Sequence, residues 1–124
     1  MRQSIRYLSD EDVQAAGLPM SEVISAVETA FREKGHGRVE MPAKLGIHPA
    51  GDGFLHAMPA FLVGLGSAGM KWVAAYPSNA DLGLPQVSGL IILNDPATGL
   101  PTAVLDAIWI TAMRTGAATA VRMA

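Results

Sequence analysis

The chain has 124 residues, the size of one ordinary domain. Half of the residues are hydrophobic and 16% are charged, which is enough apolar material for a buried core and excludes a disordered chain. A net charge of −2 is not typical of a nucleic-acid-binding domain, so we expect no nucleic-acid partner. The chain has no cysteine, which excludes disulfides and thiolate metal sites.

The N-terminal segment is polar and lacks the apolar stretch of a secretory signal. The longest uncharged stretch, residues 54–70, is interrupted by Pro59, Gly64, Gly66 and Gly69. A membrane helix needs a cleaner apolar run of about 20 residues. We therefore expect a cytoplasmic protein with no membrane partner.

Two helices are predicted near the N-terminus. Ser9 and Asp12 have the spacing of a helix-capping pair, and Gly17 ends this short helix. The second helix ends at Lys34-Gly35, a cationic last turn followed by glycine. Its apolar residues recur at helical spacing: Met20, Val23, Ile24, Val27, Ala30 and Phe31.

The middle of the chain predicts strands. Period-two patterns, in which larger side chains recur at every second residue, run over residues 45–47, 54–58 and 70–76, between prolines and glycines. Residues 89–93 and 102–105 flank a turn-rich loop that ends in Gly99, which predicts a hairpin. Asp106 is the predicted N-cap of a last helix, residues 108 to about 123, which is apolar nearly all round and therefore predicted to be buried. Helices, then strands, then a helix predict an α+β fold.

Residues 64–69 match the dinucleotide motif G-x-G-x-x-G. That motif binds a pyrophosphate only where a helix begins directly after it. Here a strand-like alternation follows and Pro77 ends it, so we interpret the segment as a loop between strands.

Three basic residues stand in apolar surroundings: Lys44, Lys71 and Arg114. A buried cation is costly unless an anion pairs with it. One interpretation is that Asp95 or Asp106 pairs with Arg114, or that the cations extend to solvent. The other is that they converge on an external carboxylate or phosphate, which an arginine can bind with two parallel hydrogen bonds. The spacing alone leaves both open.

The three histidines carry no clear chemistry. His36 and His48 lie in predicted loops or strand ends, and His56 shares a strand face with Phe54 and Met58. A lone histidine in that position is more often a hydrogen-bonded core residue than a ligand. No spacing of histidine and acidic residues indicates a metal site.

Five segments occur in order along the chain: MPAKLGIHP, HAMPAF, GMKWVAAYP, LIILNDPATGLP and ITAMRTGAATA. Together they resemble the ornithine cyclodeaminase/mu-crystallin family over essentially the whole chain. The resemblance implies a first domain in which N-terminal helices pack on a mixed, mostly antiparallel sheet, which forms a homodimer and binds the substrate. It also implies a second, Rossmann domain for NAD or NADP and a return segment that completes the first domain.

The resemblance also implies roles for single residues. Lys71 lies at the family's active-site lysine, which holds the substrate carboxylate and takes part in proton transfer near the reacting carbon. Arg114 lies at an arginine that contacts the carboxylate or the cofactor side of the cleft. Lys44 falls where many members carry an arginine for the same carboxylate, and Gln86 falls at a polar position near the cofactor.

His56 lies where the resemblance leads us to expect an acid in an enzyme that recognises ornithine. An imidazole does not attract an ammonium, which favours another small L-amino acid or a cyclic imino acid. The implied reaction is an NAD(P)-dependent deaminating cyclisation, or an oxidation or reduction of such a substrate. Because no second domain follows Ala124, we expect residues 1–124 to be a truncated domain that binds no cofactor and is inactive alone. The alternatives are a non-catalytic dimeric carboxylate-binding module and a structural dimerisation domain.

Overall fold

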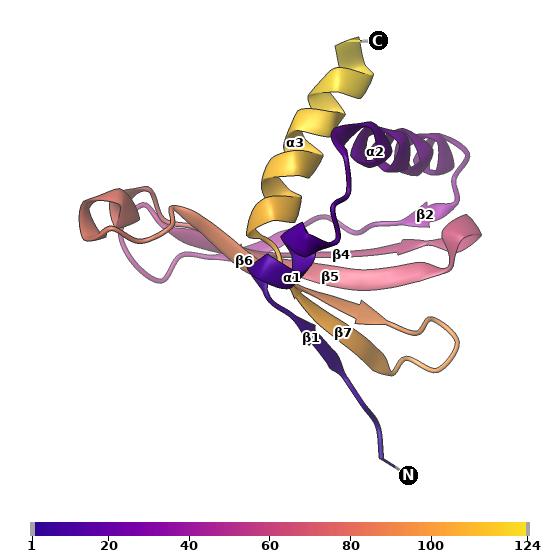
Figure 1. Cartoon of the computed structure of the whole chain (residues 1–124), viewed down its shortest axis with the longest axis horizontal. Helices are drawn as coiled ribbons and strands as arrows, with labels where there is room; N and C mark the ends of the chain where they lie inside the picture. The colour runs from indigo at the N-terminus through magenta and orange to yellow at the C-terminus, as the bar shows by residue number, and fades with distance from the viewer. Residues whose placement is uncertain (1, 124) are drawn as a thin grey trace.

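A seven-stranded mixed sheet organises the chain, and α2 and α3 lie on one side of it (Figure 1). The computed structural model describes residues 2–123, with side chains up to Arg122. The strand order is β1-β7-β6-β5-β4-β2, and β3 also pairs with β4. The elements are β1 (Arg6–Leu8), α1 (Asp10–Ala15), α2 (Met20–Gly35), β2 (Val39–Glu40), β3 (Leu45–Ile47), β4 (Phe54–Leu62), the 3-10 turn η1 (Val63–Leu65), β5 (Ser67–Ala75), the 3-10 turn η2 (Pro77–Leu82), β6 (Val87–Asn94), β7 (Pro101–Asp106) and α3 (Ile108–Met123).

The strand pairing confirms the predicted mixed, mostly antiparallel sheet. β1 runs parallel to β7, while the remaining pairs are antiparallel. The long strands β4, β5 and β6 form the centre, and β6 and β7 make the predicted hairpin around a turn in which Gly99 has a positive φ of 76°. None of the helices within residues 2–123 is long and apolar enough to cross a membrane.

The predicted capping pair at the first helix is confirmed. The Ser9 side-chain oxygen accepts a hydrogen bond from the Asp12 amide at 3.2 Å, and the Asp12 carboxylate accepts one from the Ser9 amide at 3.0 Å. This arrangement satisfies two amides that the helix itself leaves unpaired. Gly17 follows with φ at +66°, a conformation that glycine adopts without steric cost.

The last helix, α3, is attached to the sheet at its first turn. The N-cap predicted at Asp106 falls one residue early: the Ala107 carbonyl accepts the first helical hydrogen bond, from the Thr111 amide at 2.9 Å. The Asp106 carboxylate still accepts a hydrogen bond from the Ile108 amide at 2.9 Å, and the Ala107 amide donates to the Gly89 carbonyl at 2.9 Å. The predicted burial of this helix holds for one side only. Ala117 is fully buried, whereas Arg114 and Gly116 are exposed, because α2 and the sheet cover only part of the helix surface.

The glycine-rich segment lies between strands, as the sequence indicates. Its first residues form η1, Gly66 takes a positive φ of 60°, and β5 follows without a helix. Gly69 belongs to β5 itself, where an added Cβ would collide with the Ile92 carbonyl oxygen. The close pairing of β5 with β6 therefore accounts for this glycine, and no pyrophosphate is needed to explain it.

The two faces of the sheet differ in what covers them. Lys71 reaches Thr111 of α3, so Lys71 and its cross-strand partners Met58 and Ile91 define the helix-facing surface. The neighbouring residues of β5, such as Trp72, point to the opposite side, which we call the open face. No helix of residues 2–123 lies on the open face (Figure 1).

Candidate functional site

Lys71 lies at the middle of β5 on the helix-facing surface. Its amino group donates a hydrogen bond to the Thr111 hydroxyl of α3, with 3.3 Å between Nζ and Oγ1. Met58 and Ile91 are its partners on the two neighbouring strands, so the stem of the lysine runs between apolar side chains. The residue is half-buried, and burial is the main cause that lowers its pKa below the ordinary value of 10.5.

Two further cations lie close to Lys71. Arg114 is one turn beyond Thr111 on α3, and Lys44 immediately precedes β3 at the neighbouring edge of the sheet. After burial, the charges of Arg114 and then Lys44 lower the pKa of Lys71 further. Lys44 and Arg114 are both exposed. The structure thus brings together the three cations that the sequence singled out, from segments about 70 residues apart at most.

No acidic side chain within residues 2–122 pairs with this cation cluster, defined as Lys44, Lys71 and Arg114. The two ion pairs in that part of the chain join Glu28 to Arg32 and Glu33 to Arg38, both away from the cluster.

The two aspartates considered as internal partners of Arg114 are engaged elsewhere. Asp95 accepts a hydrogen bond from the Ala97 amide at 2.8 Å, and Asp106 accepts one from the Ile108 amide at 2.9 Å. The interpretation that one of them forms an ion pair with Arg114 is therefore wrong for the described residues. Like charges brought together without an anion raise the free energy of the folded chain, which an external anion would relieve.

His56 lies on the same surface, opposite Val73 and two residues along β4 from Met58. Its ring stacks on Phe54, with 4.1 Å between ring centroids and 24° between planes. Gly46 of β3 leaves room for the ring, since a Cβ there would meet His56. Among the described residues the ring makes no hydrogen bond, so stacking holds it in place instead of the expected core hydrogen bond.

Gln86 does not join the cluster. It is exposed, and its carbonyl accepts a hydrogen bond from the Tyr76 amide at 2.7 Å, just beyond the end of β5. Tyr76 is five residues along the chain from Lys71, about 16 Å at the rise of a strand. The structure therefore separates Gln86 from the three cations.

Thr111 is the residue of this surface that the sequence analysis did not single out. Its signal is its position three residues before Arg114, which places both on one side of a helix. Once Lys71 is placed on the strand under that helix, a hydroxyl there is well situated to hold the lysine amine.

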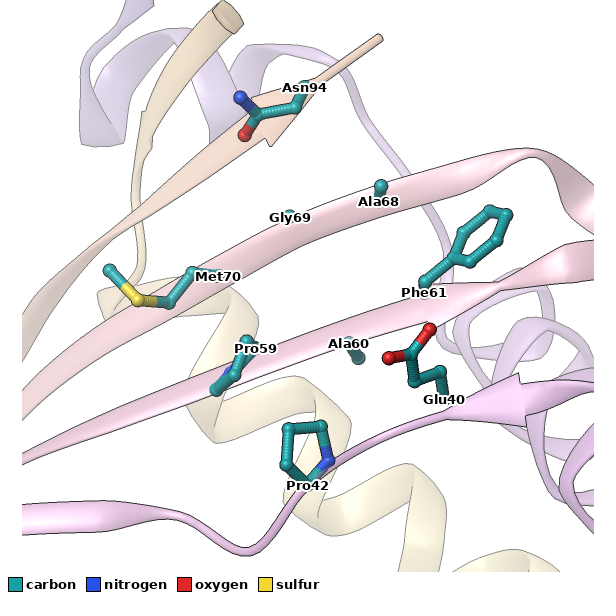
Figure 2. Close-up of a pocket in the computed structure, with 9 residues that line it drawn as sticks. All are labelled: Glu40, Pro42, Pro59, Ala60, Phe61, Ala68, Gly69, Met70 and Asn94. Atoms are coloured by element: carbon teal, nitrogen blue, oxygen red, sulfur yellow. The ribbon is translucent and has the colours of Figure 1, made fainter. Parts of the chain in front are cut away.

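A separate pocket of about 330 Å³ lies on the open face (Figure 2). Phe61, Met70 and Asn94 line it from three neighbouring strands, and the Glu40 carboxylate stands at its margin. The pocket contains no cation of the cluster. Its residues share the face of Trp72 and are largely apolar, which is typical of a surface that packs against another polypeptide and not of an anion site.

Comparisons with known proteins agree on one family. The model of the ornithine cyclodeaminase/mu-crystallin family matches residues 6–123. The chain is 48% identical to the nodulation efficiency protein NfeD of Rhizobium meliloti over 94% of its length, and covers 37% of that protein.

Solved structures show the same fold. The Δ1-pyrroline-2-carboxylate reductase of Thermococcus litoralis, in complex with NADH and L-proline, superimposes with a TM-score of 0.89 at 40% identity, over 93% of this chain and 36% of that one. An archaeal alanine dehydrogenase dimer with bound NAD gives a TM-score of 0.86 at 46% identity, over 92% and 34%. The chain thus spans about a third of the length of these relatives.

The burial and the neighbouring cations that lower the pKa of Lys71 also affect the stability of the folded chain. Because its pKa in the folded chain is below 10.5, the unfolded chain binds more protons, and folding becomes more favourable as the pH rises from the folded pKa towards 10.5. We expect Lys71→Met to raise the Tm by a few degrees at neutral pH. The gain should shrink as the pH approaches 10.5, in thermal unfolding followed by circular dichroism.

The matched control is Lys34→Met, which removes an exposed lysine from the last turn of α2. This variant should gain no stability, because a cation at a helix C-terminus is favourable. A Lys71→Met variant that is less stable than the wild type at neutral pH would contradict the prediction.

Proposed function

Because the chain belongs to the ornithine cyclodeaminase/mu-crystallin family, we propose that it forms the substrate-binding domain of an NAD(P)-dependent enzyme of amino-acid metabolism. Its substrate is a small L-amino acid or a cyclic imino acid. The reaction is an oxidation, a reduction or a deaminating cyclisation at the carbon next to the carboxylate. The domain, residues 1–124, supplies the groups that hold this carboxylate.

The observation that carries the proposal is the cation cluster without an acid. Lys71 is half-buried beside two other positive charges, and no carboxylate of residues 2–122 compensates them. A substrate carboxylate would supply the missing charge. Arg114 can bind it with two parallel hydrogen bonds and Lys44 can attract it as a point charge, while Lys71 lies beside the carbon that carries the carboxylate. Such fixing of a reactant can supply about 7–11 kcal/mol of a reaction barrier.

The relatives support this substrate class. The reductase of known structure is in complex with L-proline and NADH, and the archaeal dehydrogenase is named for alanine. Both L-proline and alanine carry one carboxylate and no side-chain charge. The apolar residues beside Lys71, Met58 and Ile91, suit a side chain of that kind.

Residues 2–123 do not fit the pyrophosphate of a dinucleotide. The glycine-rich segment leads into β5 instead of a helix, so no helix N-terminus follows it whose backbone amides could bind the phosphates. We propose that NAD or NADP is held mainly by groups other than these residues. Arg114, exposed on α3, and Gln86, at the far end of β5, are the proposed contacts of this domain with the cofactor.

Arg114→Ala tests the carboxylate site. We expect this variant to bind L-alanine and L-proline at least about 10-fold more weakly, a loss of ~1.4 kcal/mol or more, because it removes the bidentate partner. Binding is measured by isothermal titration calorimetry and by ligand-induced shifts of the Tm. The Tm of the unliganded variant should not fall, since the exposed arginine pairs with no acid of the described residues.

Arg122→Ala is the matched control, because Arg122 is exposed on the same helix two turns further on. It should bind both amino acids like the wild type. If neither amino acid binds the wild-type chain, the carboxylate site is wrong. If Arg114→Ala lowers only the Tm, a structural dimerisation domain becomes the better account.

His56 is the proposed determinant of side-chain choice. It lies on the helix-facing surface near Lys71, and an imidazole does not attract an ammonium. We expect the wild-type chain to prefer L-alanine or L-proline to L-ornithine. His56→Glu should shift the ratio of affinities towards L-ornithine several-fold, while His56→Gln should not. A wild-type chain that binds L-ornithine best in the same calorimetric series would contradict this role.

We also propose that two copies pack through their open faces. Leu45 and Ile47 are 76% and 55% exposed on this face, which also carries Trp72 and, further along β4, Phe61. An apolar surface of this extent is unfavourable in water, and the archaeal alanine dehydrogenase is a dimer. Trp72→Glu should convert the dimer to a monomer in sedimentation velocity.

Leu82→Glu is the control for this experiment, since Leu82 is 70% exposed in η2, outside the strands of the open face. It should remain dimeric. A monomeric wild-type chain, or a Trp72→Glu variant that still dimerises, would refute the proposed interface.

A further inference from the structure

The surroundings of the Lys71 amine favour its reaction as a nucleophile. Nζ lies at the end of a half-buried stem between Met58 and Ile91, with the Thr111 hydroxyl 3.3 Å away. Two other cations stand beside it and no acid of residues 2–122 is paired with it. An ion pair with a carboxylate would keep a lysine protonated, and this lysine has none among the described residues.

We propose that Lys71 condenses with the ketone of a small 2-oxo acid, such as pyruvate, to form an imine on the chain itself. This inference rests on the proposed carboxylate site, because the anion that Arg114 and Lys44 attract is the neighbour of the reacting carbon. A 2-oxo acid carries its carbonyl directly next to its carboxylate. Binding of the carboxylate therefore brings the carbonyl carbon towards Nζ.

The step balances without an oxidant or a reductant. The Lys71 ammonium gives one proton to solvent, and the nitrogen lone pair forms a C–N bond while the C=O electrons move to oxygen. The nitrogen then loses its second proton and that oxygen takes one up, which gives a neutral carbinolamine next to the Thr111 hydroxyl that hydrogen-bonds with Nζ. The hydroxyl takes back the proton that the ammonium gave to solvent and leaves as water, while the nitrogen lone pair forms the C=N bond of a protonated imine. One ammonium and one ketone thus give one iminium and one water.

The same surroundings make the reaction selective for this lysine. Burial and the two flanking cations lower the pKa of Lys71, which raises the fraction of neutral amine at neutral pH. The chain has two other lysines, Lys34 and Lys44, and both are exposed. Neither shares the half-buried position of Lys71, so we expect both to react more slowly with the ketone.

The experiment traps the imine with sodium cyanoborohydride in the presence of pyruvate at neutral pH. Intact mass spectrometry counts the adducts, and peptide mapping locates them. We expect one main adduct at Lys71, with several-fold more label than at Lys34. Acetone, a ketone without a carboxylate, should label Lys71 several-fold less than pyruvate does. Lys71→Arg, which keeps the positive charge, should lose the main adduct.

Equal labelling of Lys34 and Lys71, or no label at Lys71, would overturn the inference. If L-alanine binds in calorimetry while pyruvate leaves Lys71 unlabelled, the proposed imine is wrong and the proposed carboxylate site is retained. If L-alanine does not bind and Arg114→Ala labels Lys71 as fast as the wild type, the proposed function fails as well. A Tm of Lys71→Arg close to that of the wild type shows that loss of its adduct is not a loss of folding.

Discussion

Three positive charges share one region of the sheet's helix-facing surface, and no acid of residues 2–122 is paired with them. The half-buried Lys71 is the cation whose pKa this arrangement lowers, since burial and the charges of Arg114 and Lys44 all disfavour its protonated form. A protein that keeps such an arrangement carries a cost in stability, which a bound anion would remove. The proposed carboxylate site, the choice of substrate and the chemistry of the Lys71 amine all depend on this imbalance.

The fold brings these positive charges together from segments that are far apart in the sequence. β5 supplies Lys71, the start of β3 supplies Lys44, and α3 supplies Thr111 and Arg114. The hydrogen bond from the Ala107 amide to the Gly89 carbonyl fixes where α3 leaves the sheet, and so places Thr111 over Lys71. The other side of the same strands forms the open face with its pocket (Figure 2). One sheet therefore separates the surface proposed to bind a carboxylate from the apolar surface proposed for dimerisation.

Much of the architecture follows from local sequence. The capping pair at Ser9, the hairpin between β6 and β7, and the rejection of the glycine-rich motif all rest on neighbouring residues, and the structure confirms them. The short edge strands β1 and β2 were not predicted, because they form by pairing with β7 and β4, which lie further along the sequence. The full burial of α3 was overestimated, since an apolar composition does not say which neighbours are present. Spacing also left open whether Arg114 has an internal partner, which only the three-dimensional arrangement decides.

The most direct test is to measure the pKa of the Lys71 amine by NMR, with and without L-alanine or L-proline. Lysine side chains labelled at Nζ report this value, and Lys34 serves as an internal reference on the same chain. The account predicts a pKa below 10.5 in the free chain and a rise when the amino acid binds, because its carboxylate offsets the neighbouring cations. A Lys71 pKa that saturating amino acid leaves unchanged would contradict the claim that this surface holds a carboxylate.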